Sequence, residues 1–255
     1  MRIVVLVKHV PDALADRGFT ADRRCDRQVV SLLSELDEYA LEVARRADGD
    51  VEVIALTVGP PEAVAALRRA LSMGADRAVH VCDDAIAGSD ALGTARVLAA
   101  AITLVGDVDL VLTGASSTDA GTSLVPVQVA TLLALPVLVA AESVELADGR
   151  VRVRRGDELE DVVLSAPMPA VISVTDRSPE PMYPTARAVM MARRRLVEQW
   201  QLTDLGLTPA QVGAAAATTR VLEVQVVPPR PAGRLLHDDG TAGRLLAEFL
   251  AEVTA

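Results

Sequence analysis

Five short runs of consecutive apolar residues, rich in β-branched side chains, limit the fold of this chain more than any other feature. They occupy residues 3–7, 53–57, 78–82, 110–113 and 137–141. Runs without polar alternation are typical of strands that are covered on both faces, as in a parallel sheet. We therefore expect a central sheet with two buried faces.

Between these runs, apolar residues recur at helical spacing. Ser34 can cap a first helix, and two further amphipathic stretches cover residues 64–71 and 91–102. Strands and helices that alternate at this spacing are typical of a doubly wound α/β domain with a mostly parallel sheet. In this interpretation Asp37, Glu38 and Glu42 are solvated acids at the start of the first helix.

The pattern changes after about residue 142. Residues 144–146 and 151–155 flank an Asp-Gly turn and predict an added antiparallel hairpin within residues 143–165. Residues 160–164 and 170–174 predict two more strands. We expect the α/β domain to end near residue 201.

The C-terminal part of the chain has fewer regular elements. Residues 185–197 predict a helix with arginines in its last turns, where they complement the helix dipole. Residues 202–255 predict an extended arm that ends in an amphipathic helix over residues 241–253. Such an arm has too little core to stand alone and must pack on the body or on another polypeptide.

Charge and composition exclude several functional classes. The chain has 35 acidic and 25 basic residues and a net charge of −10, which disfavours a nucleic-acid binder. Two cysteines and three scattered histidines suggest no metal site. Residues 124–141 lack charge, but Pro126 and Pro136 interrupt them, so we expect no membrane insertion. Without a signal peptide, a cytoplasmic location is predicted.

The loop after the fourth apolar run is the most informative candidate site. It reads TGASSTDAGTSLVPVQ, with small and polar residues before a predicted helix. Backbone amides of Gly121, Thr122 and Ser123 could hold a phosphate at that helix start, although an ordinary strand-to-helix loop is the alternative. The standard glycine-rich nucleotide motifs are absent. No catalytic acid, base or nucleophile is predicted.

Several segments, in order and in register, resemble the beta (small) subunits of electron transfer flavoproteins. They include IVVLVKHVPD, SELDEYALEVA, ALSMGADRAVHV, DLVLTGASSTDAGTSLVPVQVATLLALP, PAVISVTDRSPEPMYPTARAVMMARRR and TDLGL. The resemblance covers residues 1–207. It implies a Rossmann-like, adenine-nucleotide-hydrolase-like fold and a heterodimer with an alpha subunit that holds most of a redox-active FAD.

The resemblance also implies a site and partners. The beta subunit would bind a structural AMP, with a second FAD less favoured, and electrons would pass from dehydrogenases to a quinone reductase or another acceptor. The arm would pack on the alpha subunit, and the loop from Pro179 to Met191 would dock dehydrogenases. Carried over by position, the nucleotide site comprises Leu6, Ser34, Glu35, Leu36, Asp37, Val58, Gly114, Ala115, Ser116, Ser117, Thr118, Asp119, Ala120, Gly121, Thr122, Ser123, Leu124 and Val125.

This chain differs from other members of the family at two positions, and two alternative functions are also considered. Many members have a basic or amide residue where this chain has Ala115–Ser116, and some place a leucine anchor at Ala186. The first rival is a stand-alone adenine-nucleotide-binding protein of the universal-stress type, whose glycine-spaced phosphate signature is missing here. The second is a nucleotide-hydrolysing or ligating enzyme, for which Lys8 beside the proposed pocket is a weak signal.

Overall fold

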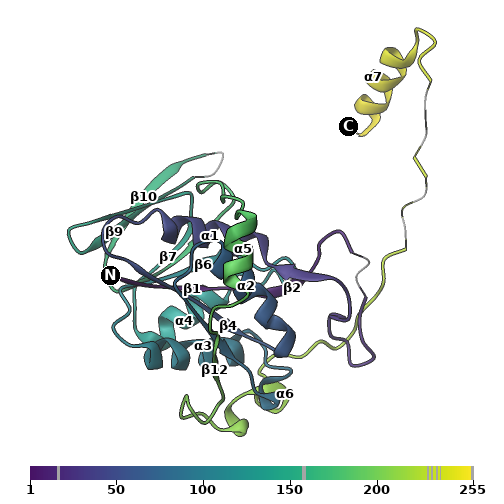
Figure 1. Ribbon diagram of the computed structural model, residues 1–255. Coiled ribbons are helices and arrows are strands. Elements are labelled where there is room, and N and C mark those ends of the chain that lie inside the picture. The colour runs from purple at the N-terminus through teal and green to yellow at the C-terminus, as the bar shows by residue number, and fades with distance from the viewer. Residues whose placement is uncertain are drawn as a thin grey trace. The chain divides into compact units, whose positions relative to one another are not determined.

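The computed structural model describes residues 1–15, 18–156, 159–228, 230, 232–233, 235 and 237–253. The chain divides into two compact units, Met1–Leu222 and Glu223–Ala255. Within the described part of the first unit, seven strands form one sheet in the order β12-β5-β4-β1-β6-β11-β7 (Figure 1). These strands are β1 (Arg2–Leu6), β4 (Glu52–Val58), β5 (Arg77–Val81), β6 (Leu110–Gly114), β7 (Val137–Ala141), β11 (Ala170–Val174) and β12 (Glu198–Trp200).

Every pair of neighbouring strands in this sheet is parallel. Val4 at the centre of β1 lies opposite Ile54 of β4 and Val111 of β6. All five apolar runs are strands of the sheet, as predicted, and the run at residues 170–174 inserts between two of them.

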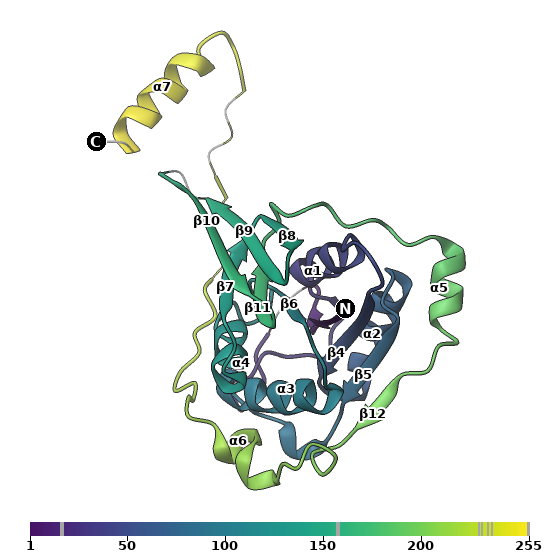
Figure 2. The same ribbon diagram turned by 90° about the vertical axis from the view of Figure 1, so that its left-hand side faces the viewer.

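Helices cover both faces of the sheet (Figure 2). Ile3 and Val5 of β1 pack in one apolar cluster with α1 (Glu35–Arg45) and α2 (Val64–Ser72). Val4 and Leu6 pack in the other cluster with α3 (Ala91–Val105) and α4 (Val125–Leu133). Because successive side chains of a strand point to opposite faces, one strand supplies both clusters, and the doubly wound prediction is confirmed.

Short helices close several loops of the first unit. They are η1 (Pro61–Ala63), η2 (Asp84–Ile86), η3 (Pro209–Gln211) and α6 (Gly213–Ala216). The chain after β12 still contributes to the body, because Leu202 and Val212 are buried in the cluster under α3 and α4.

The predicted hairpin is present and is part of a larger antiparallel sheet. Strands β8 (Ser143–Ala147), β9 (Arg150–Gly156) and β10 (Asp161–Pro167) pair in the order β10-β9-β8. Val151 and Val153 of β9 are buried against the α1 side, while the alternate arginines face outward. This alternation is expected of a sheet with one solvated face.

The predicted helix over residues 185–197 was wrong in its length. Helix α5 spans Ala186–Ala192, and the Thr185 side chain caps it by accepting a hydrogen bond from the Ala188 amide at 3.2 Å. The Arg195 guanidinium then donates to the Ala75 and Asp76 carbonyls. These bonds lead the chain away from the helix, and β12 joins the sheet edge beside β5 instead.

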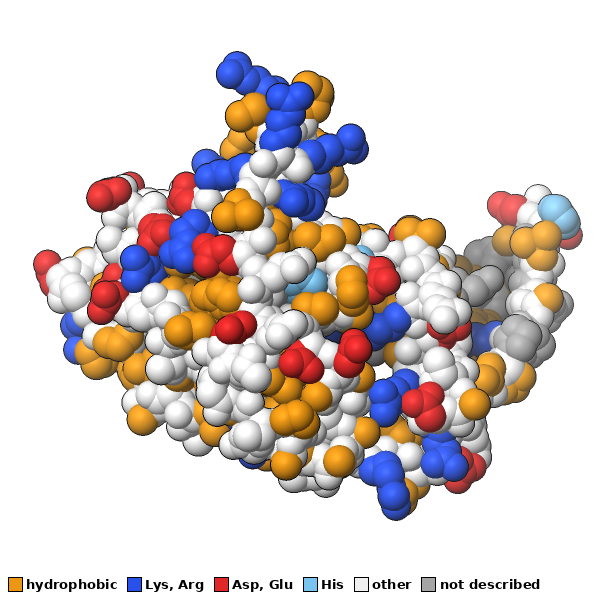
Figure 3. Space-filling view, turned by 60° about the horizontal axis from the view of Figure 1, so that its bottom comes forward, with side chains coloured by type: hydrophobic (Ala, Val, Ile, Leu, Met, Phe, Trp, Pro, Cys, Tyr) orange, Lys and Arg blue, Asp and Glu red, His pale blue; other side chains and the backbone are white. Residues whose placement is uncertain are grey.

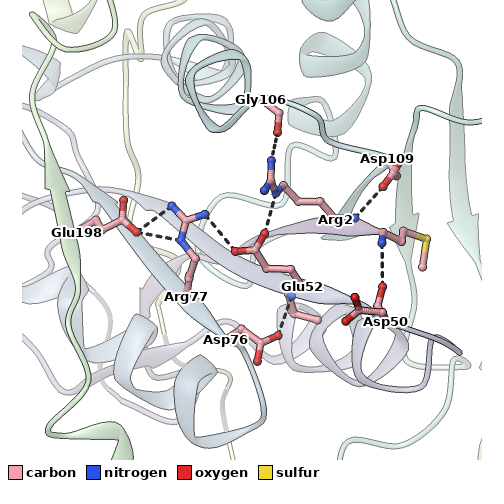
Figure 4. A network of polar contacts seen from close by, with 10 residues as sticks. Arg2, Asp50, Glu52, Asp76, Arg77, Gly106, Asp109 and Glu198 are labelled. Atoms are coloured by element: carbon pink, nitrogen blue, oxygen red, sulfur yellow. Dashed lines mark hydrogen bonds and ion pairs between the residues drawn. The ribbon is translucent and has the colours of Figure 1, made fainter.

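The amino edge of the main sheet is held by an ionic network. Arg2 pairs with Glu52, and Arg77 pairs with both Glu52 and Glu198 (Figure 4). Each of these residues begins a strand, so the network joins β1, β4, β5 and β12 at one edge. The opposite, carboxyl edge carries the candidate site.

The second unit contains α7 (Ala242–Val253), which confirms the predicted terminal helix. None of its described residues is buried. Among the helices in the described ranges of the chain, none combines the length and apolar character needed to cross a membrane.

Candidate functional site

The order of strands reverses between β1 and β6, at the carboxyl edge of the sheet. The chain leaves β1 and later enters α1 on one face, whereas it leaves β6 for α4 on the other face. Adjacent strands whose connections diverge in this way leave the binding crevice usual for open α/β sheets. Two predicted segments, residues 34–37 and 114–125, flank it.

Asp37 joins these two segments. One carboxyl oxygen, Oδ2, accepts a hydrogen bond from the Lys8 amide at 2.8 Å, and Oδ1 accepts one from the Gly114 amide at 3.2 Å. The Ser34 amide donates to the Lys8 carbonyl at 2.9 Å. The start of α1 is therefore fastened to the ends of both β1 and β6.

The interpretation of Asp37 and Glu42 as solvated acids was wrong. Asp37 is 7% exposed and Glu42 only 2%. Burial raises the pKa of Asp37 to about 7, although the bonds from the Lys8 and Gly114 amides partly oppose this rise. For Glu42, burial acts to raise the pKa, but Arg45 and Arg46 outweigh it and hold the pKa at about 2.

Gly114 allows the close approach of α1 to β6. A Cβ atom at this position would lie 2.7 Å from Asp37 Oδ1 and 2.7 Å from Leu36 Cβ. Such distances are shorter than van der Waals contact, so any side chain here would push the helix start away.

A second cluster of charged side chains is centred on Asp119, in the loop between β6 and α4. Asp119, whose side chain is 1% exposed, pairs with Lys8 Nζ at 2.8 Å and with the Arg27 guanidinium. Lys8 Nζ also bonds Ser117 Oγ at 3.1 Å. Burial acts to raise the pKa of Asp119, but these partners lower it to about 2. Lys8, the only lysine of the chain, was the one sequence signal for this cluster.

The remaining loop residues present backbone rather than charged side chains. Gly121 and Ser123 have positive φ of 58° and 53°, and the Gly121 amide donates to the Ser117 carbonyl at 2.9 Å. Within the described chain, the amides of Thr122, Ser123 and Leu124 have no hydrogen-bond partner. They lie next to the start of α4, which has no side-chain cap and no acidic residue in its first turn.

One buried hydroxyl at this edge has no partner among the described residues. Ser34 is 0% exposed, yet its Oγ makes no hydrogen bond, and the same holds for Gln128 Oε1 on α4. Buried polar atoms normally have partners, so an unpaired one is a candidate to bind an ordered water or a polar ligand. Backbone amides can bind an anion such as a phosphate, and a hydroxyl can bind a neutral polar atom, so these groups fit the chemistry of a nucleotide.

The other predicted site residues lie at strand ends or at the surface. Leu6 and Val58 end β1 and β4 and pack in the cluster under α3 and α4, while Glu35 is exposed. Ala115 and Ser116 follow β6, where the Ala115 amide bonds the Val174 carbonyl at 2.8 Å. In the described ranges, no group of three or more acidic, histidine or cysteine side chains is arranged to hold a metal ion.

Comparisons with known proteins agree on one family. The family profile described as "Electron transfer flavoprotein domain" matches residues 24–205. The electron transfer flavoprotein subunit beta of Mycobacterium bovis is 37% identical, with 97% of each chain covered. The subunit beta of Megasphaera elsdenii is 32% identical over 100% of this chain and 98% of its own. The caffeyl-CoA reductase-Etf complex subunit CarD of Acetobacterium woodii is 33% identical, with 92% of each covered.

Proposed function

The chain belongs to the electron transfer flavoprotein family as a beta subunit, and from this premise we propose that it binds AMP in the crevice between β1 and β6. It is thus one component of an electron carrier that includes an alpha subunit. AMP is favoured over a second FAD. The phosphate would lie at the amides following Gly121, and the nucleoside would lie toward residues 34–37.

The unpaired Ser34 hydroxyl is the observation that carries this proposal. It is fully buried where α1 begins, and the amides of Thr122 and Ser123 in the loop after β6 also have no hydrogen-bond partner among the described residues. A hydroxyl and backbone amides at the same edge of the sheet suit a ligand with both a polar ring and an anion. Asp37 and Asp119 already have partners, so neither carboxylate is left to repel a phosphate.

We further propose that the FAD held with the alpha subunit supplies the electron chemistry of the complex. The residues of this chain would frame the flavin and hold the two subunits together, and none would act as an acid, base or nucleophile. The arm that includes α7 would pack on the alpha subunit, because Leu246, Phe249 and Val253 of α7 are more than half exposed and a partner surface would cover them. A cytoplasmic location stays a prediction.

The loop from Pro179 to Met191 is proposed to dock the dehydrogenases that reduce the complex and so feed a quinone reductase or another acceptor. The relative from A. woodii is named as part of a caffeyl-CoA reductase complex. That name makes dehydrogenases of CoA thioesters the first donors to test.

Co-expression with a candidate alpha subunit tests the proposal. The complex is purified through a tag on this chain alone, denatured, and its released nucleotides are separated by chromatography. We expect a yellow heterodimer that releases one FAD and one AMP. Two FAD and no AMP would refute the AMP assignment. A colourless homo-oligomer that binds ATP would instead support the universal-stress type of protein.

A further inference from the structure

The chain takes a long route between the end of β1 and the start of α1. On the way it forms a hairpin from β2 (His9–Pro11) and β3 (Ser31–Leu33), which pair antiparallel. We call residues 9–15 and 18–33 the β2–β3 hairpin, and Figure 1 shows it in purple beside the β2 label. Because it begins after β1 and ends directly before Ser34, the hairpin belongs to the β1 and α1 side of the crevice.

One arginine of this hairpin reaches the loop on the other side of the crevice. The Arg27 guanidinium donates to the His9 carbonyl at 3.2 Å and pairs with Asp119, whose side chain is 1% exposed, in the loop between β6 and α4. By contrast, the basic side chains on the projection at the upper edge of Figure 3, which α5 forms, face solvent. Arg27 instead joins two segments that lie 92 positions apart in the chain.

The contacts that join the two sides of the crevice lie at two depths. Asp37, at the start of α1, accepts a hydrogen bond from the Gly114 amide and is only 7% exposed. Lys8 and Arg27, which share Asp119, have side chains that are 40% and 43% exposed. The Asp37 contact is therefore the inner connection, and the two ion pairs of Asp119 are the outer ones.

The two cations of the outer connection differ in how firmly they are placed. The backbone of Lys8 is fixed on both sides, because its amide donates to Asp37 and its carbonyl accepts from the Ser34 amide. Arg27 lies beyond the end of the β2–β3 ladder, toward the tip of the hairpin. Its ion pair can therefore open while Lys8 continues to neutralise Asp119, so that no buried carboxylate is left without a partner.

We propose that the Arg27–Asp119 ion pair is a latch that holds the crevice closed over the bound nucleotide and limits its release. This inference rests on the proposed function and adds a residue that retains AMP. Arg27 acts through Asp119 and the hairpin, so it is a positioning residue. A partly exposed ion pair contributes little to folding, but opening it before each release slows the release by about 5-fold.

Nucleotide exchange in the purified complex with the alpha subunit tests the latch. The complex is mixed with an excess of isotope-labelled AMP, and mass spectrometry of the nucleotide retained after gel filtration gives the release rate. R27Q should release AMP about 5-fold faster than the wild type. R27K keeps the charge but loses the planar fork, so its rate should lie between the two. Added NaCl should speed release from the wild type and hardly affect R27Q, because salt screens the ion pair.

A matched control removes another arginine of the same hairpin. Arg24 pairs with Asp22 at 2.9 Å within the hairpin, and R24Q should release AMP at the wild-type rate. Equally fast release from R24Q and R27Q would show that the hairpin as a whole closes the crevice, and it would overturn the latch. Wild-type release from R27Q would also overturn it and leave AMP binding standing. A wild-type complex that holds no AMP would overturn the proposed function, and the latch with it.

Discussion

Asp37 shows how a single residue sets the geometry of the candidate site. Its carboxyl group accepts hydrogen bonds from amides at the ends of two strands and is almost removed from water. A buried carboxylate is costly unless it is paired, and among the described residues no cation forms an ion pair with this one. The proton that Asp37 binds near neutral pH is the physical consequence.

Stability should therefore depend on the protonation of Asp37. Its pKa rises from the ordinary 3.8 to about 7, so between these values the folded state holds a proton that the unfolded state lacks. Stability is greatest at the acidic end of this window and falls as pH rises through 7. We expect urea unfolding at pH 5–8 to show the wild type losing up to about 1.4 kcal/mol per pH unit relative to D37N.

Other groups do not obscure this comparison. Asp119 and Glu42 have lowered pKa values, so their contribution is lost only below about pH 4.5. Burial lowers the pKa of His9, which makes stability fall as pH drops below 6.5, the opposite direction. Since His9 is present in both proteins, parallel curves for wild type and D37N would contradict the role given to Asp37.

Ser34 allows ligand binding to be separated from folding. Because its buried Oγ has no partner, S34A should leave the thermal stability of the nucleotide-free chain unchanged or slightly higher. Loss of one hydrogen bond to AMP should weaken binding about 5-fold, measured by calorimetric titration. The control is S72A on α2, where Oγ donates to the Arg69 carbonyl at 2.7 Å. That variant should lose stability and keep its affinity, and the reverse pattern would remove Ser34 from the site.

At the scale of elements, predictability followed the length of the periodic pattern. The five apolar runs and the first helices were predictable because a buried sheet and an amphipathic helix leave repeating signatures. Strands β2 (His9–Pro11), β3 (Ser31–Leu33) and β12 have three residues each, too few for any period. Pairing between distant segments, rather than local preference, makes them strands.

The location of the candidate site could be predicted from the sequence, but the contacts within it could not. Strand ends and small residues located residues 114–125, but the bonds that Asp37 and Asp119 form connect segments far apart in the chain. No local pattern distinguishes Glu42, buried beneath two arginines, from a solvated helix acid. The bonds of Asp37 and Asp119 are tertiary, whereas Glu42 pairs within its own helix and only its burial depends on the tertiary fold.

The Asp119 cluster should control the mobility of the loop between β6 and α4. Asp119 is buried, whereas Lys8 and Arg27 are 40% and 43% exposed and can return to water when the carboxylate is removed. D119N should cost about 1–3 kcal/mol in denaturant unfolding and speed amide exchange in residues 115–124. E145Q is the control, since that exposed pair with Arg152 spans 3.9 Å. Unchanged exchange in D119N would show that the cluster does not hold the loop.

At the scale of the whole molecule, the amino and carboxyl edges of the main sheet differ in how completely their polar groups are paired. The amino edge is joined by Arg2, Glu52, Arg77 and Glu198, which pair among themselves. At the carboxyl edge, by contrast, the amides of Thr122, Ser123 and Leu124 and the Ser34 hydroxyl have no hydrogen-bond partner in the described part of the chain. The carboxyl edge therefore combines contacts that hold the fold with polar groups that a ligand could bind.

The second unit should matter for assembly and little for folding. None of its described residues is buried, and Leu246, Phe249 and Val253 of α7 are 55–66% exposed. A chain ending at Leu222 should therefore keep its thermal midpoint within about 2 °C, because burial of apolar surface supplies most stability. The same truncation should weaken retention of the alpha subunit at least about 10-fold in a tag pull-down, the loss expected when an apolar anchor is removed.

A full-length variant distinguishes the apolar face of α7 from the mere length of the arm. L246D/F249D/V253D keeps every residue of the chain but makes that face charged, so it should release the alpha subunit as the truncation does. If the truncated chain unfolds, the arm belongs to the core of the body. If both variants retain the alpha subunit, its contact lies elsewhere on the first unit, and the arm must be given another task.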